Sequence, residues 1–190
     1  MQGIGAVLVL SCGMATAIVG IQQPKPDGPK VNADALVLQD FKQRIDKYME
    51  LHNRLEKKTP PLKKVDDPEK IQASQQALAA AIRTERAGAK QGDIFTPEIA
   101  ERLRRLIHPE VTGTKGVKTK EAIKEDAPPA VVLKVNTPYT ADALPTVPPN
   151  VLANLPQLPE DLEYRIIGRD LILRDVHANL IVDFIPRIMR

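Results

Sequence analysis

The clearest pattern in the chain is one apolar stripe between residues 33 and 58. Large apolar side chains and one histidine recur there at spacings of three and four residues, which is typical of one face of an α-helix. The stripe consists of Leu38, Phe41, Ile45, Tyr48, His52 and Leu55. Asn32 is suited to cap the start, and Pro60 ends the pattern because the residue before a proline resists helical geometry. The pattern predicts a long amphipathic helix.

Two more helices are predicted between residues 67 and 108. Asp67, Pro68 and Glu69 form a typical helix start, and apolar positions follow it with several alanines between them. A shorter helix is expected to start at Thr96 and to stop at Pro109. The first two helices are joined by a short turn, so they are expected to pack as an antiparallel hairpin.

The C-terminal part is rich in β-forming residues. Runs at 162–167, 171–173 and 180–185 are separated by turn residues at 168–170 and 175–179, which predicts a three-stranded antiparallel meander. Alternation places one set of side chains on its apolar face: Tyr164, Ile166, Leu171, Leu173, Val182 and Phe184.

The segment between the helices and the meander differs in composition. Residues 109–129 are predicted to be a linker with a short helix possible at 118–125, and residues 130–135 to be a strand. Six prolines fall between 138 and 159, so this stretch is expected to be extended or turn-rich. The expected fold class is α+β: an N-terminal antiparallel α-helical hairpin at 33–108 with a third short helix, a Pro-rich connector, and a small C-terminal antiparallel β-meander, the last two within 130–190.

The N-terminus has the pattern of an export signal. Residues 3–21 carry no charge, residues 4–10 are densely apolar, and Ala15-Thr16-Ala17 is a small-residue cleavage site. We expect residues 1–17 to be a cleaved signal peptide, with an uncleaved membrane anchor or a lipid-modified Cys12 as alternatives. Residues 18–32 then form an extended tether. Cys12 is the only cysteine, so the mature chain would have neither a disulfide nor a thiolate nucleophile.

Composition argues against a nucleic-acid partner. The 190-residue chain has a formal net charge of +3, only 3% aromatic residues and no Trp. Single-stranded nucleic acid is bound by stacking on aromatic rings, and duplexes by strongly basic surfaces. Two lysine pairs at 57–58 and 63–64 form a modest basic patch, which we interpret as a solvated turn, with contact to anionic lipid or polysaccharide as the alternative.

No cluster in the sequence predicts a metal site. The three histidines are His52, His108 and His177, and no two of them have the spacing of ligands on one helix. His52 falls on the apolar stripe and is interpreted as a core or interface residue. His177 falls in a turn and is expected to be solvated. We therefore predict no metal-ligating residues.

Catalysis is likewise not predicted. Ser74 is the only serine after the signal, and it falls in the polar middle of a helix rather than on the exposed turn that a nucleophile requires. Carboxylate pairs such as Asp66-Asp67 and Glu160-Asp161 are better explained by capping or solvation. There is no Gly-rich phosphate loop. We predict no catalytic residue, no cofactor-binding residue, no cofactor and no enzyme activity.

Residues 158–185 carry a family resemblance. The stretches Tyr164-Arg165-Ile166-Ile167-Gly168-Arg169-Asp170-Leu171-Ile172-Leu173 and Leu180-Ile181-Val182-Asp183-Phe184-Ile185, after Leu158-Pro159, resemble the C-terminal module of nickel/cobalt-homeostasis periplasmic proteins of the RcnB type. The whole chain is similar to uncharacterised secreted bacterial envelope proteins. The resemblance implies a location in the envelope and defines no catalytic residue.

The sequence leaves two hypotheses on function. The first is a periplasmic or extracellular, non-enzymatic protein that acts through contacts with an envelope protein or a cell-surface component. The alternative is a periplasmic stress or metal-homeostasis accessory protein with chaperone-like use of the helical hairpin. Membrane association through residues 3–21 is expected only if the signal is not cleaved.

Overall fold

The computed structural model describes most of the chain after the N-terminal segment. The described residues are 32–60, 67–112, 116, 117, 119, 121, 133–139 and 147–189. The predicted signal, nearly all of the tether and residues 130–132 of the predicted strand lie outside them. Residues 31–190 form one compact unit. Among the described residues, no helix is long and apolar enough to cross a membrane.

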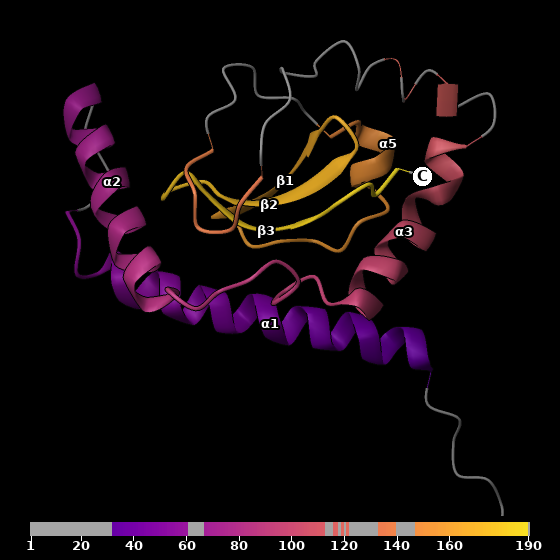
Figure 1. The fold of residues 1–190 in the computed structure, drawn as a ribbon, viewed down its shortest axis with the longest axis horizontal. Helices are drawn as coiled ribbons and strands as arrows, with labels where there is room; N and C mark the ends of the chain where they lie inside the picture. The colour runs from indigo at the N-terminus through magenta and orange to yellow at the C-terminus, as the bar shows by residue number, and fades with distance from the viewer. Residues whose placement is uncertain are drawn as a thin grey trace, which may run out of the picture. The chain divides into compact units, whose positions relative to one another are not determined.

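The predicted α+β fold class is confirmed. Helices come first in the chain and a three-stranded antiparallel sheet comes last (Figure 1). The helices are α1 (Ala33–Glu56), α2 (Pro68–Glu85), α3 (Pro97–Val111) and a short α5 (Pro149–Leu152). The strands β1 (Leu162–Ile167), β2 (Asp170–Asp175) and β3 (Leu180–Ile185) pair in the order β1-β2-β3.

The long helices begin where their capping residues predict. The side chain of Asn32 accepts a hydrogen bond from Asp34 N–H, and that of Asp67 accepts one from Glu69 N–H. The apolar stripe of α1 is buried over most of its length, with Leu38 half-buried. The predicted hairpin is only partly formed: α2 contacts α1, but Figure 1 shows it leaving α1 at a steep angle instead of lying along it.

Two details of the helices differ from the expectations. The helix α3 continues past Pro109 to Val111. The free energy gained by burying Ile107 and Val111 offsets the loss of the hydrogen bond that the proline cannot donate. At the end of the helix, Thr112 Oγ1 donates to the carbonyl oxygen of His108. Ser74 is buried and donates to the carbonyl oxygen of Pro60, so it does not lie on a polar face.

The Pro-rich connector is not wholly extended. The short helix α5 lies within it and begins with Pro149. Proline is tolerated there because a backbone N–H at the first helical position would have no partner within the helix. The predicted strand at 130–135 is not seen in its described residues. Pairing occurs further along instead, where Pro138 bridges to Leu180 and Ile181 N–H donates to the carbonyl oxygen of Thr137.

The sheet separates two apolar clusters. Its inner face packs against residues of α1, α2, α3 and α5 in the main core, and its outer face carries Ile167, Ile172 and Ile181 under Tyr139. Phe184 belongs to the outer cluster, so its predicted place on the inner face is wrong. The pairing register shifts between Leu173 and Arg174, and this bulge breaks the alternation that the prediction assumed.

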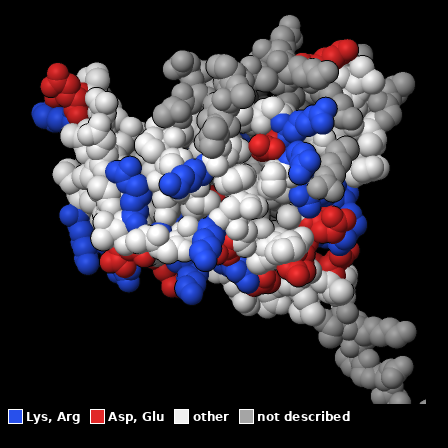
Figure 2. Space-filling model, viewed as in Figure 1, with Lys and Arg blue, Asp and Glu red and all other residues white. Residues whose placement is uncertain are grey.

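The helical surface is charged but mixed in sign. On the face shown in Figure 2, Lys and Arg side chains alternate with Asp and Glu along α1. Two ion pairs, Lys42 with Asp46 and Arg44 with Asp40, join residues four apart on this helix. Such pairs at an exposed helix surface are worth a few tenths of a kcal/mol each, about 0.3–0.5. They are typical of a solvated face.

Candidate metal centre

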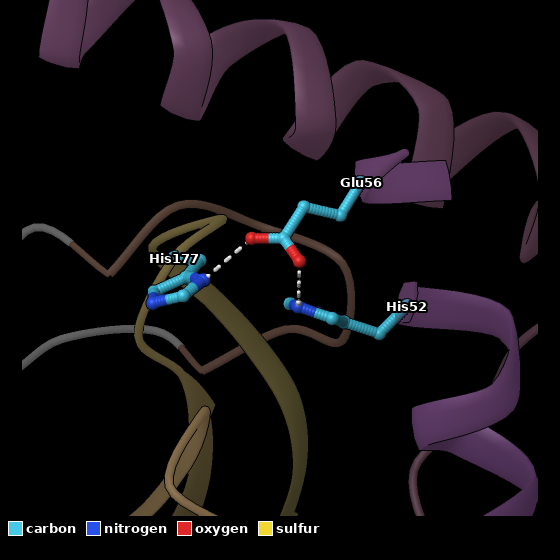
Figure 3. Close-up of side chains that lie close together, drawn as sticks. All are labelled: His52, Glu56 and His177. Atoms are coloured by element: carbon cyan, nitrogen blue, oxygen red, sulfur yellow. Dashed lines mark hydrogen bonds and ion pairs between the residues drawn. The ribbon is translucent and has the colours of Figure 1, made fainter. Parts of the chain in front are cut away.

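One polar cluster lies where the C-terminal half of α1 passes the end of the sheet. It contains His52 and Glu56 from α1, Asp161 just before β1, and His177 from the turn between β2 and β3. Figure 3 shows the side chains of His52, Glu56 and His177 turned toward one another. Ligand atoms of these three residues all lie within 4.8 Å of one another.

The positions of the two α1 residues follow from helical geometry. His52 and Glu56 are four residues apart, so they lie on the same face, one turn from each other. The imidazole of His52 is wholly buried, at 0% exposure, whereas the side chain of Glu56 is 27% exposed. The pair therefore reaches from the core to the surface at this end of the sheet.

Strand pairing brings the other two residues to the same place. Val176 N–H donates to the carbonyl oxygen of Asp161, which holds the start of β1 beside the β2–β3 turn. His177 sits in that turn, with its Nδ1 2.9 Å from Glu56 Oε1 and its Nε2 3.4 Å from Asp161 Oδ1. The side chains of His177 and Asp161 are about one-quarter exposed, at 26% and 25%.

One buried nitrogen of His52 has no hydrogen-bond partner in the part of the chain that the structure describes. His52 Nε2 lies 4.0 Å from Glu56 Oε2 and 3.9 Å from Asp161 Oδ2, both too long for hydrogen bonds. A divalent transition ion bonds nitrogen and oxygen at about 2.0–2.2 Å, so an ion between two such ligands spans up to about 4.3 Å. The distances from His52 Nε2 to the two carboxylate oxygens are therefore too long for hydrogen bonds, but they leave room for an ion that bonds to both atoms.

The other nitrogen of His52 is held by a carboxylate. Nδ1 lies 2.7 Å from Asp175 Oδ2, and Tyr48 O–H donates to the same oxygen at 2.7 Å. A carboxylate only accepts hydrogen bonds, so Nδ1 carries a proton, and whenever the ring is neutral its Nε2 lone pair faces the cluster. A histidine that ligates a metal is commonly oriented in this way by a carboxylate on its second nitrogen.

Electrostatics at the cluster favour a cation. Glu56, Asp161 and Asp175 surround two imidazoles, which gives a surplus of negative charge. Burial by itself lowers the pKa of His52, but hydrogen bonding to Asp175 and the charges of Asp175, Asp161 and Glu56 outweigh burial and raise this pKa above its ordinary value. The same carboxylates that attract a proton to His52 also attract a divalent ion.

The structure changes two expectations about the histidines. His52 is buried, as its place on the stripe predicted, but it is also the buried end of a polar cluster. The expectation of a solvated His177 is wrong, because this side chain is half-buried and hydrogen-bonded to Glu56. His108 is exposed in the last turn of α3 and is not part of the cluster. Sequence analysis predicted no metal ligands, and the geometry now offers a candidate set.

Comparison with known proteins gives no functional lead. No protein-family model matches the chain, and no curated protein or solved structure matches it. The chemistry of the cluster is therefore the basis for inferring a function.

Proposed function

We propose that this protein binds a divalent transition-metal ion, with His52, Glu56 and His177 as ligands and Asp161 beside them. The observation that carries the proposal is the fully buried His52 Nε2, which has no hydrogen-bond partner among the described residues and is aimed at two carboxylates and a second imidazole. Leaving a buried nitrogen unpaired costs free energy, and a metal bond would remove this cost.

The ligand set indicates the class of ion. Two imidazole nitrogens with carboxylate oxygens suit Zn²⁺, Co²⁺, Ni²⁺ or Cu²⁺, whereas Mg²⁺ and Ca²⁺ prefer an all-oxygen environment. The described residues contain no cysteine, so thiolate ligands, which favour Cu⁺, do not come from them. Competition among the four suited ions follows the general order of stability, in which Cu²⁺ binds most tightly.

The metal site favours the second of the two hypotheses on function. A metal-homeostasis or stress accessory protein of the bacterial envelope would bind an ion without transforming it. The side chains of Glu56 and His177 are about one-quarter exposed, at 27% and 26%, which suits an ion that enters and leaves from solvent. Export itself depends on residues 1–17, outside the described residues, and remains a proposal together with the periplasmic or extracellular location.

Isothermal titration calorimetry on the untagged full chain tests the proposal. Zn²⁺, Co²⁺, Ni²⁺ and Cu²⁺ would be titrated, with Mg²⁺ and Ca²⁺ as controls for ion class. The wild type is expected to bind one transition ion per chain. His177→Ala should weaken or abolish binding, whereas the matched variant His108→Ala, at an exposed histidine outside the cluster, should bind as the wild type does.

Two results would overturn the proposal. One is equal affinity of the two histidine variants for the transition ions, which would place any binding elsewhere. The other is binding of Mg²⁺ as tight as that of Zn²⁺, which would indicate a nonspecific acidic surface.

A further inference from the structure

Asp175 connects the two histidines of the candidate metal centre. This residue ends β2, and its side chain is wholly buried, at 0% exposure. Oδ2 accepts hydrogen bonds from Tyr48 O–H and from His52 Nδ1–H, both at 2.7 Å. Oδ1 accepts from Ala178 N–H, also at 2.7 Å. The carboxylate therefore joins α1 to the turn that carries His177.

We propose that Asp175 is the positioning residue of the metal centre and that it sets both imidazoles through its two oxygens. This inference rests on the proposed metal binding. Asp175 is not one of the three residues whose ligand atoms converge, and its oxygens accept hydrogen bonds from Tyr48, His52 and Ala178. Its effect on the ion is exerted through His52 and His177.

The first oxygen sets the tautomer of His52. With Nδ1–H donated to Asp175 Oδ2, the lone pair of the neutral ring is on Nε2, the atom that faces Glu56 and Asp161. The opposite tautomer would direct an N–H at the place of the ion and could not ligate it. Tyr48, one turn earlier on α1, donates to the same oxygen and restricts the carboxylate to this orientation.

The second oxygen sets the turn. Ala178 directly follows His177, and its N–H is the donor to Asp175 Oδ1. Asn179 follows in the left-handed region, at φ 48°, so the turn has an unusual backbone that needs such support. The turn places the His177 ring against Glu56, with the centroids of the two imidazoles 5.8 Å apart.

The substitution Asp175→Asn tests these roles because it keeps the size of the side chain and changes only its hydrogen-bonding groups. An amide replaces one oxygen by an NH₂ donor, and either orientation opposes a donor already present. If NH₂ takes the place of Oδ2, it faces His52 Nδ1 and favours the wrong tautomer. If it takes the place of Oδ1, it faces Ala178 N–H and loosens the turn that carries His177. Loss of such a supporting partner typically weakens metal affinity roughly 10–100-fold.

Asp183→Asn is the matched control. Asp183 is equally buried, at 0% exposure, and also accepts hydrogen bonds from backbone N–H groups, but it touches no residue of the cluster in the described structure. Both variants are expected to unfold more easily than the wild type. Only Asp175→Asn is expected to weaken Zn²⁺ binding in calorimetry. If Asp175 had a merely structural role, the two variants would change Zn²⁺ affinity to the same extent.

Long-range ¹H–¹⁵N correlation spectra of the metal-free wild type provide a readout that needs neither a variant nor an ion. At a pH where His52 is neutral, its ring is expected to carry the proton on Nδ1. A proton on Nε2 would overturn the inference, and so would a Zn²⁺ affinity unchanged by Asp175→Asn. If the wild type binds no transition ion at all, the proposed function fails, whichever tautomer the spectra show.

Discussion

His52 Nδ1 and Asp175 Oδ2 lie 2.7 Å apart although 123 residues separate them in the chain. Both side chains are fully buried, so the contact is made between the C-terminal part of α1 and the end of the central strand, β2. Burying a carboxylate is costly unless it is well hydrogen-bonded, and Asp175 accepts from three donors. The contact ties α1 to the sheet and at the same time orients a proposed metal ligand.

Transition ions should stabilise the folded protein. The three proposed ligands come from α1 and from the β2–β3 turn, and unfolding separates them. At a free Zn²⁺ concentration about 100 times the Kd, binding adds about 2.7 kcal/mol to the free energy of unfolding. For a chain of this size, that corresponds to a rise in Tm of about 5–11 °C. Differential scanning calorimetry with Zn²⁺ measures it, and an equal rise with Mg²⁺ would contradict it.

Local signals predicted most of the secondary structure. Capping side chains at Asn32 and Asp67 accept the hydrogen bonds that their positions suggested, and the three strands fall where alternating apolar runs lie. Such features depend on a few neighbouring residues and can be seen in sequence. Two predictions failed for non-local reasons. The helix α3 does not stop at Pro109 because Val111 is buried in the core, and Phe184 lies on the outer face because a bulge breaks the alternation of the strand.

The candidate metal centre could not be predicted from the spacing of residues in the sequence. Its residues come from a helix, a loop and a turn, and only folding brings them together. A weaker signal was present: His52 is the one ionisable side chain besides Tyr48 on an otherwise apolar stripe, and Glu56 follows it by four residues. A second signal was Asp175 with His177 in one turn. Neither signal indicated that the two segments meet.

Truncation of the α1 stripe should destabilise the protein. Ile45 is only 3% exposed within the main core, so Ile45→Ala is expected to lower the free energy of unfolding by about 2–5 kcal/mol. Leu36→Ala on the same helix is the control, because Leu36 is 52% exposed, and a change below about 0.5 kcal/mol is expected there. Urea unfolding followed by circular dichroism measures both, and equal losses would show that the stripe is not the core face.

The ion pairs of Glu163 should make stability depend on acid pH. Burial raises the pKa of Glu163, but hydrogen bonds from Arg165 and Arg174 outweigh burial and hold this pKa below its ordinary value. A lowered folded-state pKa stabilises the fold above the unfolded pKa of about 4.3, and the contribution is lost as pH falls through the folded value. Glu163→Gln should therefore be less stable than the wild type at pH 7, with the gap closing below about pH 4.

Urea titrations at several pH values measure that gap. Glu160→Gln provides the matched control, since Glu160 is exposed and only three residues away. Its stability is expected to follow that of the wild type throughout. A gap for Glu163→Gln that stays constant down to pH 3 would show that the two arginines do not stabilise the charged carboxylate.

Asp183 should hold the loop between α2 and α3 onto the sheet. Its Oδ2 accepts from Ile94 N–H and Phe95 N–H at 2.8 Å, and its Oδ1 accepts from Gly92 N–H at 2.9 Å. Gly92 lies at φ 94°, a conformation that glycine adopts readily, so the loop can turn its amides toward one carboxylate. Asp183→Asn replaces one acceptor by a donor that faces these amides. The free energy of unfolding is expected to fall by about 2–4 kcal/mol.

Asp170→Asn is the control for Asp183→Asn, because Asp170 makes an ordinary, exposed carboxylate contact. Asp170 also accepts from one backbone N–H, that of Arg187 at 2.7 Å, but at an exposed site, where water replaces a lost partner, so a loss below about 1 kcal/mol is expected. Hydrogen exchange locates the effect: the amides of Ile94 and Phe95 should lose protection in Asp183→Asn and keep it in Asp170→Asn. If both amides stay protected in Asp183→Asn, the carboxylate is not what holds the loop, because an amide hydrogen that has lost its buried acceptor must exchange whenever the loop opens.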